Sequence, residues 1–168
     1  MALDADPDVA AVASQPMWLH WVSESGEARR HAPDFFARRA DGTGVLIDVR
    51  PDDRVTAADG AVFAVTAVIA GQAGWAYDRV GELPAARAAN LRWLAGYRHP
   101  RYARAAVMAA LAEVFAEPGP LRAGAARAGD PVTVLPVLFA MLWRGRLAAD
   151  LDGRVLDPAT VVRTAGER

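Results

Sequence analysis

A short polar turn between two strand-like segments is the feature that most constrains the fold of this chain. The turn is the tetrapeptide DGTG at residues 41–44, and the apolar run VLIDV follows it at residues 45–49. Tetrapeptides with glycine and aspartate at these positions commonly reverse the chain between neighbouring strands. We therefore predict that a strand over residues 31–38 pairs with a largely buried strand over residues 45–49.

The segments around this pair predict a mixed α/β domain. An aromatic and branched run at residues 16–22, followed by the turn-like SESGE, indicates a first strand of the same meander. Residues 57–73 are compatible with a helix that stops at Gly74, and residues 75–80 return as a short strand. The order βββαβ is typical of a sheet with a helix covering one face.

The second half of the chain is mainly helical. Apolar patterns predict helices over about residues 84–96, 102–115 and 132–144, and two short strands at residues 147–151 and 154–156 around the turn Asp152-Gly153. Helices followed by a small hairpin are the order of a winged-helix module. We therefore predict two domains, residues 1–98 and residues 99–168, the second a small winged-helix-like α+β module.

Composition narrows the chemistry that the chain can carry. With 168 residues it can form one hydrophobic core and a small appended module. It has no cysteine, which excludes disulfides, thiolate zinc sites and a cysteine nucleophile, so a metal must be held by oxygen or imidazole ligands. The absence of cysteine also favours a reducing compartment.

The apolar runs are those of a globular protein. The longest, residues 61–70 and 132–143, fall well short of the about 20 residues that span a bilayer. Residues 1–12 contain three aspartates and no basic residue, unlike a signal peptide. We expect a cytoplasmic, nucleoid-associated protein without a membrane segment.

Charge is balanced overall but uneven along the chain. The net charge is −1 and all 19 basic residues are arginine, so DNA contacts would need local patches. The stretch between Glu82 and Glu113 contains no acid and interleaves arginines with Trp93, Tyr97 and Tyr102. It is either a DNA-facing patch or a solvated helix face with its aromatics turned inward. The candidate DNA-contacting residues are Arg98, Arg101, Arg104, Arg144 and Arg146.

Two aspartates form the candidate metal site. Asp34 follows Pro33 on the second predicted strand, and Asp48 lies on the third, so adjacent antiparallel strands can bring both carboxylates to one sheet edge. Mg²⁺ is usually held by one or two carboxylates with waters and substrate phosphate, and the carbonyl of Val49 could add a ligand. Arg50 shares a face with Asp48 and would point at the same phosphate.

The same residues also have an ordinary interpretation. Pro-Asp is a common turn dipeptide, and Asp-x-Arg at a strand end often forms a surface ion pair. Asp48, however, follows the apolar Val-Leu-Ile run, where a charge is costly unless a metal or a partner satisfies it. His31, three positions before Asp34, is a further candidate for contact with the substrate or the metal shell.

Several segments resemble a known family. HAPDFFARRADGTGVLIDVRPDDR (residues 31–54), GWAYDRVGE (residues 74–82), NLRWLAGYRHPR (residues 90–101) and LFAMLWRGRLAADL (residues 138–151) are similar to TnsA-like heteromeric transposase endonuclease subunits, which carry a PD-(D/E)xK nuclease core. The resemblance implies a restriction-endonuclease-like fold, Mg²⁺ (or Mn²⁺) dependence, cutting of double-stranded DNA at transposon ends, and a partner transposase. By position, Asp34 and Asp48 correspond to the metal-binding acids and Arg50 to the lysine.

Two departures limit what the resemblance implies. The upstream helix that carries the family's first acidic residue, a glutamate, is absent from these residues, through a misassigned start or truncation. Arg50 cannot act as a proton-transfer base because its pKa exceeds about 12, although it can stabilise phosphate charge. We expect the chain alone to bind Mg²⁺ or Mn²⁺ weakly and to cut DNA poorly. The alternatives are an inactive remnant that binds DNA or a protein partner, and an unrelated α/β domain.

Overall fold

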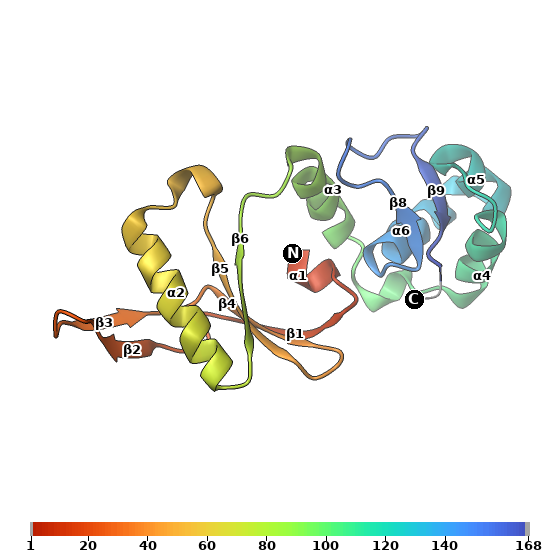
Figure 1. Cartoon of the computed structure of the whole chain (residues 1–168). Coiled ribbons are helices and arrows are strands. Elements are labelled where there is room, and N and C mark those ends of the chain that lie inside the picture. The colour runs from red at the N-terminus through yellow and green to blue at the C-terminus, as the bar shows by residue number, and fades with distance from the viewer. Residues whose placement is uncertain (1, 167–168) are drawn as a thin grey trace. The chain divides into compact units, whose positions relative to one another are not determined.

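The computed structural model describes residues 2–166, which divide into two compact units (Figure 1). The first unit is residues 8–82, and the second combines residues 2–7 with residues 83–166. The division thus falls between Glu82 and Leu83, whereas the sequence placed a boundary between residues 98 and 99. The reason is that helix α3 (Ala85–Ala95) packs against helix α6 (Pro131–Trp143) of the second unit.

The first unit is built on a mixed sheet with strand order β1-β4-β5-β6. Its strands are β1 (Val9–Ser14), β4 (Phe35–Arg39), β5 (Gly44–Val49) and β6 (Ala76–Val80). The first three are antiparallel neighbours, and β6 joins β5 in parallel after helix α2 (Ala57–Gln72). The prediction of a mixed α/β fold is therefore confirmed, and Figure 1 shows α2 lying across the sheet.

A strand and a hairpin turn form in the segment around residues 16–22, as predicted, but the place of this strand in the meander was predicted wrongly. The run at residues 16–22 does not join the main sheet; its strand β2 (Leu19–Val22) pairs with β3 (Ala28–His31) as a separate ribbon. A tight turn closes this ribbon, in which the Ser23 amide donates to the Glu27 carbonyl at 2.9 Å. The place beside β4 is taken by β1, whose alanine-rich sequence VAAVAS gives little strand signal.

Helix α2 begins at a capping box and covers one face of the sheet. The Thr56 hydroxyl accepts from the Asp59 amide at 3.1 Å, and the Asp59 carboxylate accepts from the Thr56 amide at 3.0 Å. After the helix, Gly74 takes a φ of 73°, a conformation that glycine adopts without cost, and the chain turns into β6. Ala70 on the inner face of α2 packs in one core with Leu46 of β5.

The tryptophans of this unit differ in burial. Trp21 and Trp75 pack against the core around Leu46, and Trp75 meets Phe36 edge-on at 4.9 Å. Trp18, in contrast, is 59% exposed, with the Arg30 guanidinium 4.9 Å from its ring. Trp18 is exposed because it directly precedes the buried Leu19, and adjacent side chains of an extended segment point to opposite faces.

The second unit is a cluster of helices with a small sheet. Its helices are α1 (Ala2–Ala5), α3, α4 (Ala105–Val114), α5 (Leu121–Ala128) and α6, and its strands are β7 (Gly119–Pro120), β8 (Leu147–Ala149) and β9 (Val161–Thr164), in the order β7-β9-β8. Short 3₁₀ turns, η1 (Asp52–Arg54) in the first unit and η2 (Pro100–Tyr102) in the second, precede α2 and α4. The predicted helices thus correspond to α3, α4 and α6, while α5 was not predicted.

The predicted C-terminal hairpin is only partly correct. Residues 147–149 form β8, but residues 154–156 do not form a strand, and β8 pairs with β9 instead. The loop between them is ordered by side-chain turns: the Asp150 carboxylate accepts from the Gly153 amide at 3.0 Å, and Asp157 accepts from the Ala159 amide at 2.8 Å. They lie on either side of residues 154–156, whose Arg154 carbonyl and Leu156 amide are hydrogen-bonded to the Asn90 side chain rather than to a neighbouring strand.

Helix α6 forms the centre of the second core. It is apolar on nearly every side, and its residues Val134, Val137 and Leu138 are buried together with Leu111 and Phe115. A helix of this kind is stabilised by burial rather than by amphipathic contact with water. Within the described residues no single helix is long and apolar enough to cross a membrane, although α5 and α6, bent by 120°, pass that test of length and composition as a pair.

Candidate metal centre

The two candidate acids lie where β4 begins and β5 ends. Phe35 of β4 lies opposite Ile47 of β5. Asp34 directly precedes β4, in the loop, so it lies outside the strand predicted to carry it. Because Leu46 and Asp48 alternate with Ile47, Asp48 points to the face of the sheet that α2 covers.

Asp48 is a buried carboxylate that is already hydrogen-bonded. It is 2% exposed, and His31 Nε2 lies 2.9 Å from its Oδ1 and 3.1 Å from its Oδ2. The Tyr77 hydroxyl donates to Oδ2 at 3.0 Å. Since an ionised carboxylate can only accept, the histidine nitrogen facing it must carry the proton. Two donors from β3 and β6 therefore satisfy the charge that the sequence indicated would need a partner.

Tyr77 is held in its protonated form. Burial raises the pKa of its hydroxyl far above the ordinary value of 10.0, and the neighbouring Asp48 charge and hydrogen bond raise it further. The ring also contacts Phe63 of α2, with centroids 6.5 Å apart. The Tyr77 hydroxyl therefore keeps its proton and donates a hydrogen bond to Asp48, while the contact with Phe63 of α2 holds the ring in place.

Asp34 and Val49 are joined to each other. The Asp34 Oδ2 accepts a hydrogen bond from the Val49 amide at 2.8 Å, which fixes the carboxylate at the end of β5. Val49 was predicted to offer its carbonyl to a metal. The structure shows a different group of this residue, the amide, in contact with Asp34. This bond ties the loop before β4 to the strand that carries Asp48.

Arg50 points to the start of α2. Its guanidinium lies 3.3 Å from Asp59 Oδ1, and its carbonyl accepts from Arg79 Nη1 at 2.8 Å. Hydrogen bonds from Thr56, and to a lesser degree the Arg50 charge, hold the pKa of Asp59 below its usual range. Arg50 is thus anchored beside the candidate acids as one half of a partly exposed ion pair.

The described residues offer two candidate carboxylates, Asp34 and Asp48, and no complete set of metal ligands. In the part of the chain that the structure describes, no group of three or more His, Asp or Glu side chains is arranged to hold a metal ion. Mg²⁺ needs only one or two protein carboxylates when waters and a substrate phosphate complete its shell. His31, predicted as a contact of the substrate or metal, instead touches Asp48. Tyr77 was not singled out, although its place on the strand after α2 could have suggested it.

The candidate DNA-contacting arginines all lie in the second unit. Arg144 follows the last residue of α6 and Arg146 precedes β8, as predicted. Arg144 Nη2 donates to the Arg98 carbonyl at 3.3 Å, and Arg98 Nη1 donates to the Ala95 carbonyl at 2.8 Å. These bonds bring Arg98 and Arg144, which lie far apart in the sequence, into one neighbourhood.

Of two more of these arginines, Arg101 lies within the turn η2 and Arg104 follows it. The Arg101 guanidinium lies 4.8 Å from the centroid of the Tyr102 ring and donates to its hydroxyl at 2.9 Å. Arg104 is exposed at the residue before α4. Arg87, from the same acid-free stretch, is instead paired with Asp152 at 2.8 Å. A positive face here therefore depends on arginines other than Arg87.

The aromatic residues of the acid-free stretch pack on one another. Tyr97 lies 5.0 Å from Phe139 of α6 and 5.4 Å from Tyr102, between ring centroids. Trp93 meets Phe139 edge-on at 5.8 Å and remains 55% exposed. The inward-facing interpretation therefore describes Tyr97 and Tyr102, whereas Trp93 is half in contact with solvent.

Comparison with known proteins does not assign the chain. No protein-family model matches the sequence, and no curated protein matches it at a significant level. The resemblance to TnsA-like endonucleases thus stays a prediction that depends on the residues themselves.

Proposed function

We propose that this chain is a metal-dependent DNA endonuclease subunit that cuts phosphodiester bonds at transposon ends together with a partner transposase. The observation that carries the proposal is the hydrogen bond from the Val49 amide to the Asp34 carboxylate, which holds one candidate acid beside the residue that follows the other. The surrounding βββαβ sheet supports it, since this is the arrangement that the resemblance implies.

Each residue of the centre has a defined role in this proposal. Asp34, Asp48 and the carbonyl of Val49 would hold Mg²⁺ or Mn²⁺, an ion that supplies an activated water and stabilises charge on phosphorus. His31 and Tyr77 orient the Asp48 carboxylate through their hydrogen bonds. Arg50 contributes positive charge toward the phosphate and does not move a proton.

The second unit supports binding to DNA or to the partner. The element order α4-β7-α5-α6-β8-β9, with β9 between the other two strands, agrees with a winged-helix arrangement. Helix α6 contains no charged residue, so base contacts from it are not expected. In this proposal Arg98, Arg101, Arg104, Arg144 and Arg146 contact the phosphate backbone.

A second candidate function is a catalytically inactive module that binds DNA or a protein partner. It is favoured by the bonds of Asp48, whose charge is satisfied without a metal. The acidic β8–β9 loop, which contains Asp150, Asp152 and Asp157, also suits a protein partner better than a DNA backbone.

Metal binding and DNA cutting test the proposal together. Calorimetric titration of the full chain with Mn²⁺ should give binding that Asp34→Ala or Asp48→Ala weakens by at least about tenfold. Asp78→Ala is the matched control, because this exposed carboxylate lies on β6 opposite Ile47 and so on the other face of the sheet. Nicking of a supercoiled plasmid carrying the element's ends should follow the same order, and circular dichroism should show each variant folded.

Two results would decide against the endonuclease. A folded wild-type chain that shows no Mn²⁺ binding, with or without DNA, would favour the inactive module. Nicking that survives both alanine substitutions would mean that the active site lies elsewhere.

A further inference from the structure

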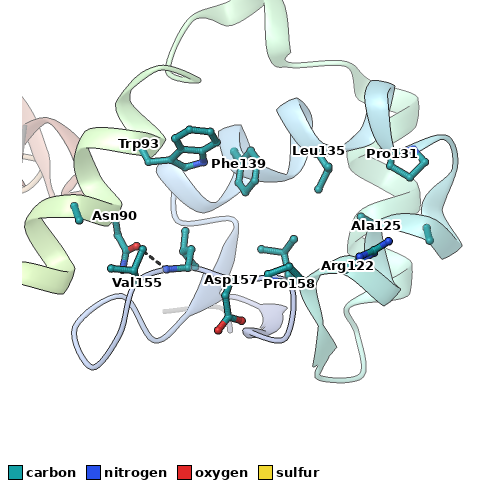
Figure 2. A pocket seen from close by; sticks show the side chains of 14 residues that line it. Asn90, Trp93, Arg122, Ala125, Pro131, Leu135, Phe139, Val155, Asp157 and Pro158 are labelled. Carbon is teal, nitrogen blue, oxygen red and sulfur yellow. Dashed lines mark hydrogen bonds between the residues drawn. The ribbon is translucent and has the colours of Figure 1, made fainter.

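The second unit contains a cavity of about 800 Å³ that the proposed nuclease function does not use. It lies within that unit, between α3, α5, α6 and the segment before β9 (Figure 2). Its volume falls within the range of about 300–1,000 Å³ typical of small-molecule sites. From its walls and its charge we infer that it binds a small amphipathic organic anion, an apolar or aromatic body that carries one carboxylate.

The walls of the cavity are mainly apolar. Figure 2 shows Trp93, Phe139 and Leu135 along one wall, with Val155 and Pro158 across from them. Trp93 is 55% and Val155 57% exposed, so large apolar surfaces face the opening without cover from the described chain. An apolar ligand body would remove these surfaces from water, and the Trp93 ring offers an aromatic face to it.

The cavity is held open by a buried asparagine. Asn90 is 1% exposed, and its Nδ2 donates to the carbonyls of Leu151 and Arg154, both at 2.9 Å. Its Oδ1 accepts from the Leu156 amide at 2.8 Å. These three bonds tie the segment before β9 to α3, so both walls are positioned before a ligand arrives. They also engage both polar atoms of Asn90, which leaves recognition of a ligand's charge to other groups.

The available charge in the lining is positive. Asp157 is engaged by the Ala159 amide, by Thr160 Oγ1 at 3.2 Å and by Arg154 at 3.4 Å. Arg122, on the first turn of α5, is exposed, and within the described residues its side chain makes no hydrogen bond or ion pair. A guanidinium beside an apolar cavity is suited to a carboxylate, which it can bind through two parallel hydrogen bonds.

Two dyes separate the apolar and ionic parts of this proposal. Anilinonaphthalenesulfonate has an aromatic body and one anion that stands in for the carboxylate, whereas Nile red is apolar and neutral. In fluorescence titrations of the full chain, Arg122→Gln should weaken the anionic dye about tenfold and leave Nile red unchanged. Arg127→Gln is the matched control, since this exposed arginine lies on the same helix but outside the lining.

A filled cavity provides the third variant. Ala126 lines the cavity and is exposed, so Ala126→Trp should weaken both dyes while circular dichroism stays unchanged. If Ala126→Trp leaves both dyes bound, the cavity is not their site and the inference is wrong. If it removes both dyes but Arg122→Gln affects neither, the groove accepts an uncharged apolar group, such as a partner's side chain, and the anion is wrong. Asp34→Ala should change none of these results, which separates them from a failure of the nuclease proposal.

Discussion

A carboxylate at the end of a buried strand is stable only if other groups satisfy its charge. Asp48 follows Val45, Leu46 and Ile47, all buried, and receives hydrogen bonds from His31 and Tyr77. The sequence indicates the need for such partners, because an unpaired buried charge is costly. It does not identify them. His31 is placed near Asp48 by the pairing of β2 with β3, and Tyr77 by the parallel pairing of β6 with β5, and neither pairing can be read from the sequence.

Removing one of these donors should destabilise the fold. In Tyr77→Phe the buried carboxylate loses a hydrogen bond, and we expect the free energy of unfolding to fall by about 1–3 kcal/mol. Tyr102→Phe is the control, because among the described residues its hydroxyl bonds only to the exposed Arg101 and its loss should cost far less. Urea unfolding followed by circular dichroism measures both, and equal losses would contradict a structural role for the Tyr77 hydroxyl.

The Tyr77 hydroxyl should also make the free energy of unfolding depend on pH in the alkaline range. The pKa of Tyr77 is raised in the folded state, so the folded chain keeps this proton when the unfolded chain has lost it. Its contribution is therefore fully present below the ordinary value of 10.0 and is lost as pH rises through the folded value. Unfolding free energies measured from neutral pH to above pH 10.0 should fall more steeply for the wild type than for Tyr77→Phe.

At the scale of elements, two helix-interior glycines should respond to alanine in opposite directions. Gly60 in α2 is exposed with open space around it, so Gly60→Ala should stabilise by about 0.5–1 kcal/mol. In α5 an added Cβ at Gly124 would lie 2.2 Å from Cζ of the fully buried Phe115, so Gly124→Ala should destabilise by about 1–3 kcal/mol. Thermal unfolding tests the pair, and shifts of the same sign would contradict the described packing.

These helices also illustrate what the sequence can and cannot predict. Helix α2 has a glycine stop and α6 has a long apolar run, so both were predicted close to their observed limits. Helix α5, with the sequence LRAGAARA, was not predicted because it contains a glycine and lies between Pro120 and Gly129, which usually interrupt helices. Strand β1 was missed because alanine packs weakly in a sheet, and its pairing with β4 depends on residues more than 20 positions away.

The whole chain has a net charge of only −1, but its positive charge is concentrated locally, as in the acid-free stretch between Glu82 and Glu113. If the second unit contacts DNA through its arginines, affinity should fall steeply with salt. The double variant Arg144→Ala with Arg146→Ala should then flatten the log–log slope by about 0.9 for each lost phosphate contact. Arg127→Gln, on α5, is the control. An unchanged slope in the double variant would assign Arg144 and Arg146 to surface solvation.

Strand β1 forms one edge of the main sheet, and this has a consequence for solubility. Its sequence VAAVAS carries no charge, and five of its six side chains are exposed. An uncharged edge strand offers its free backbone groups to strands of other molecules, which is a route to aggregation. Asp8 and Pro16 flank the strand closely. A charged residue and a residue without an amide proton at these positions both disfavour pairing with a strand of another molecule.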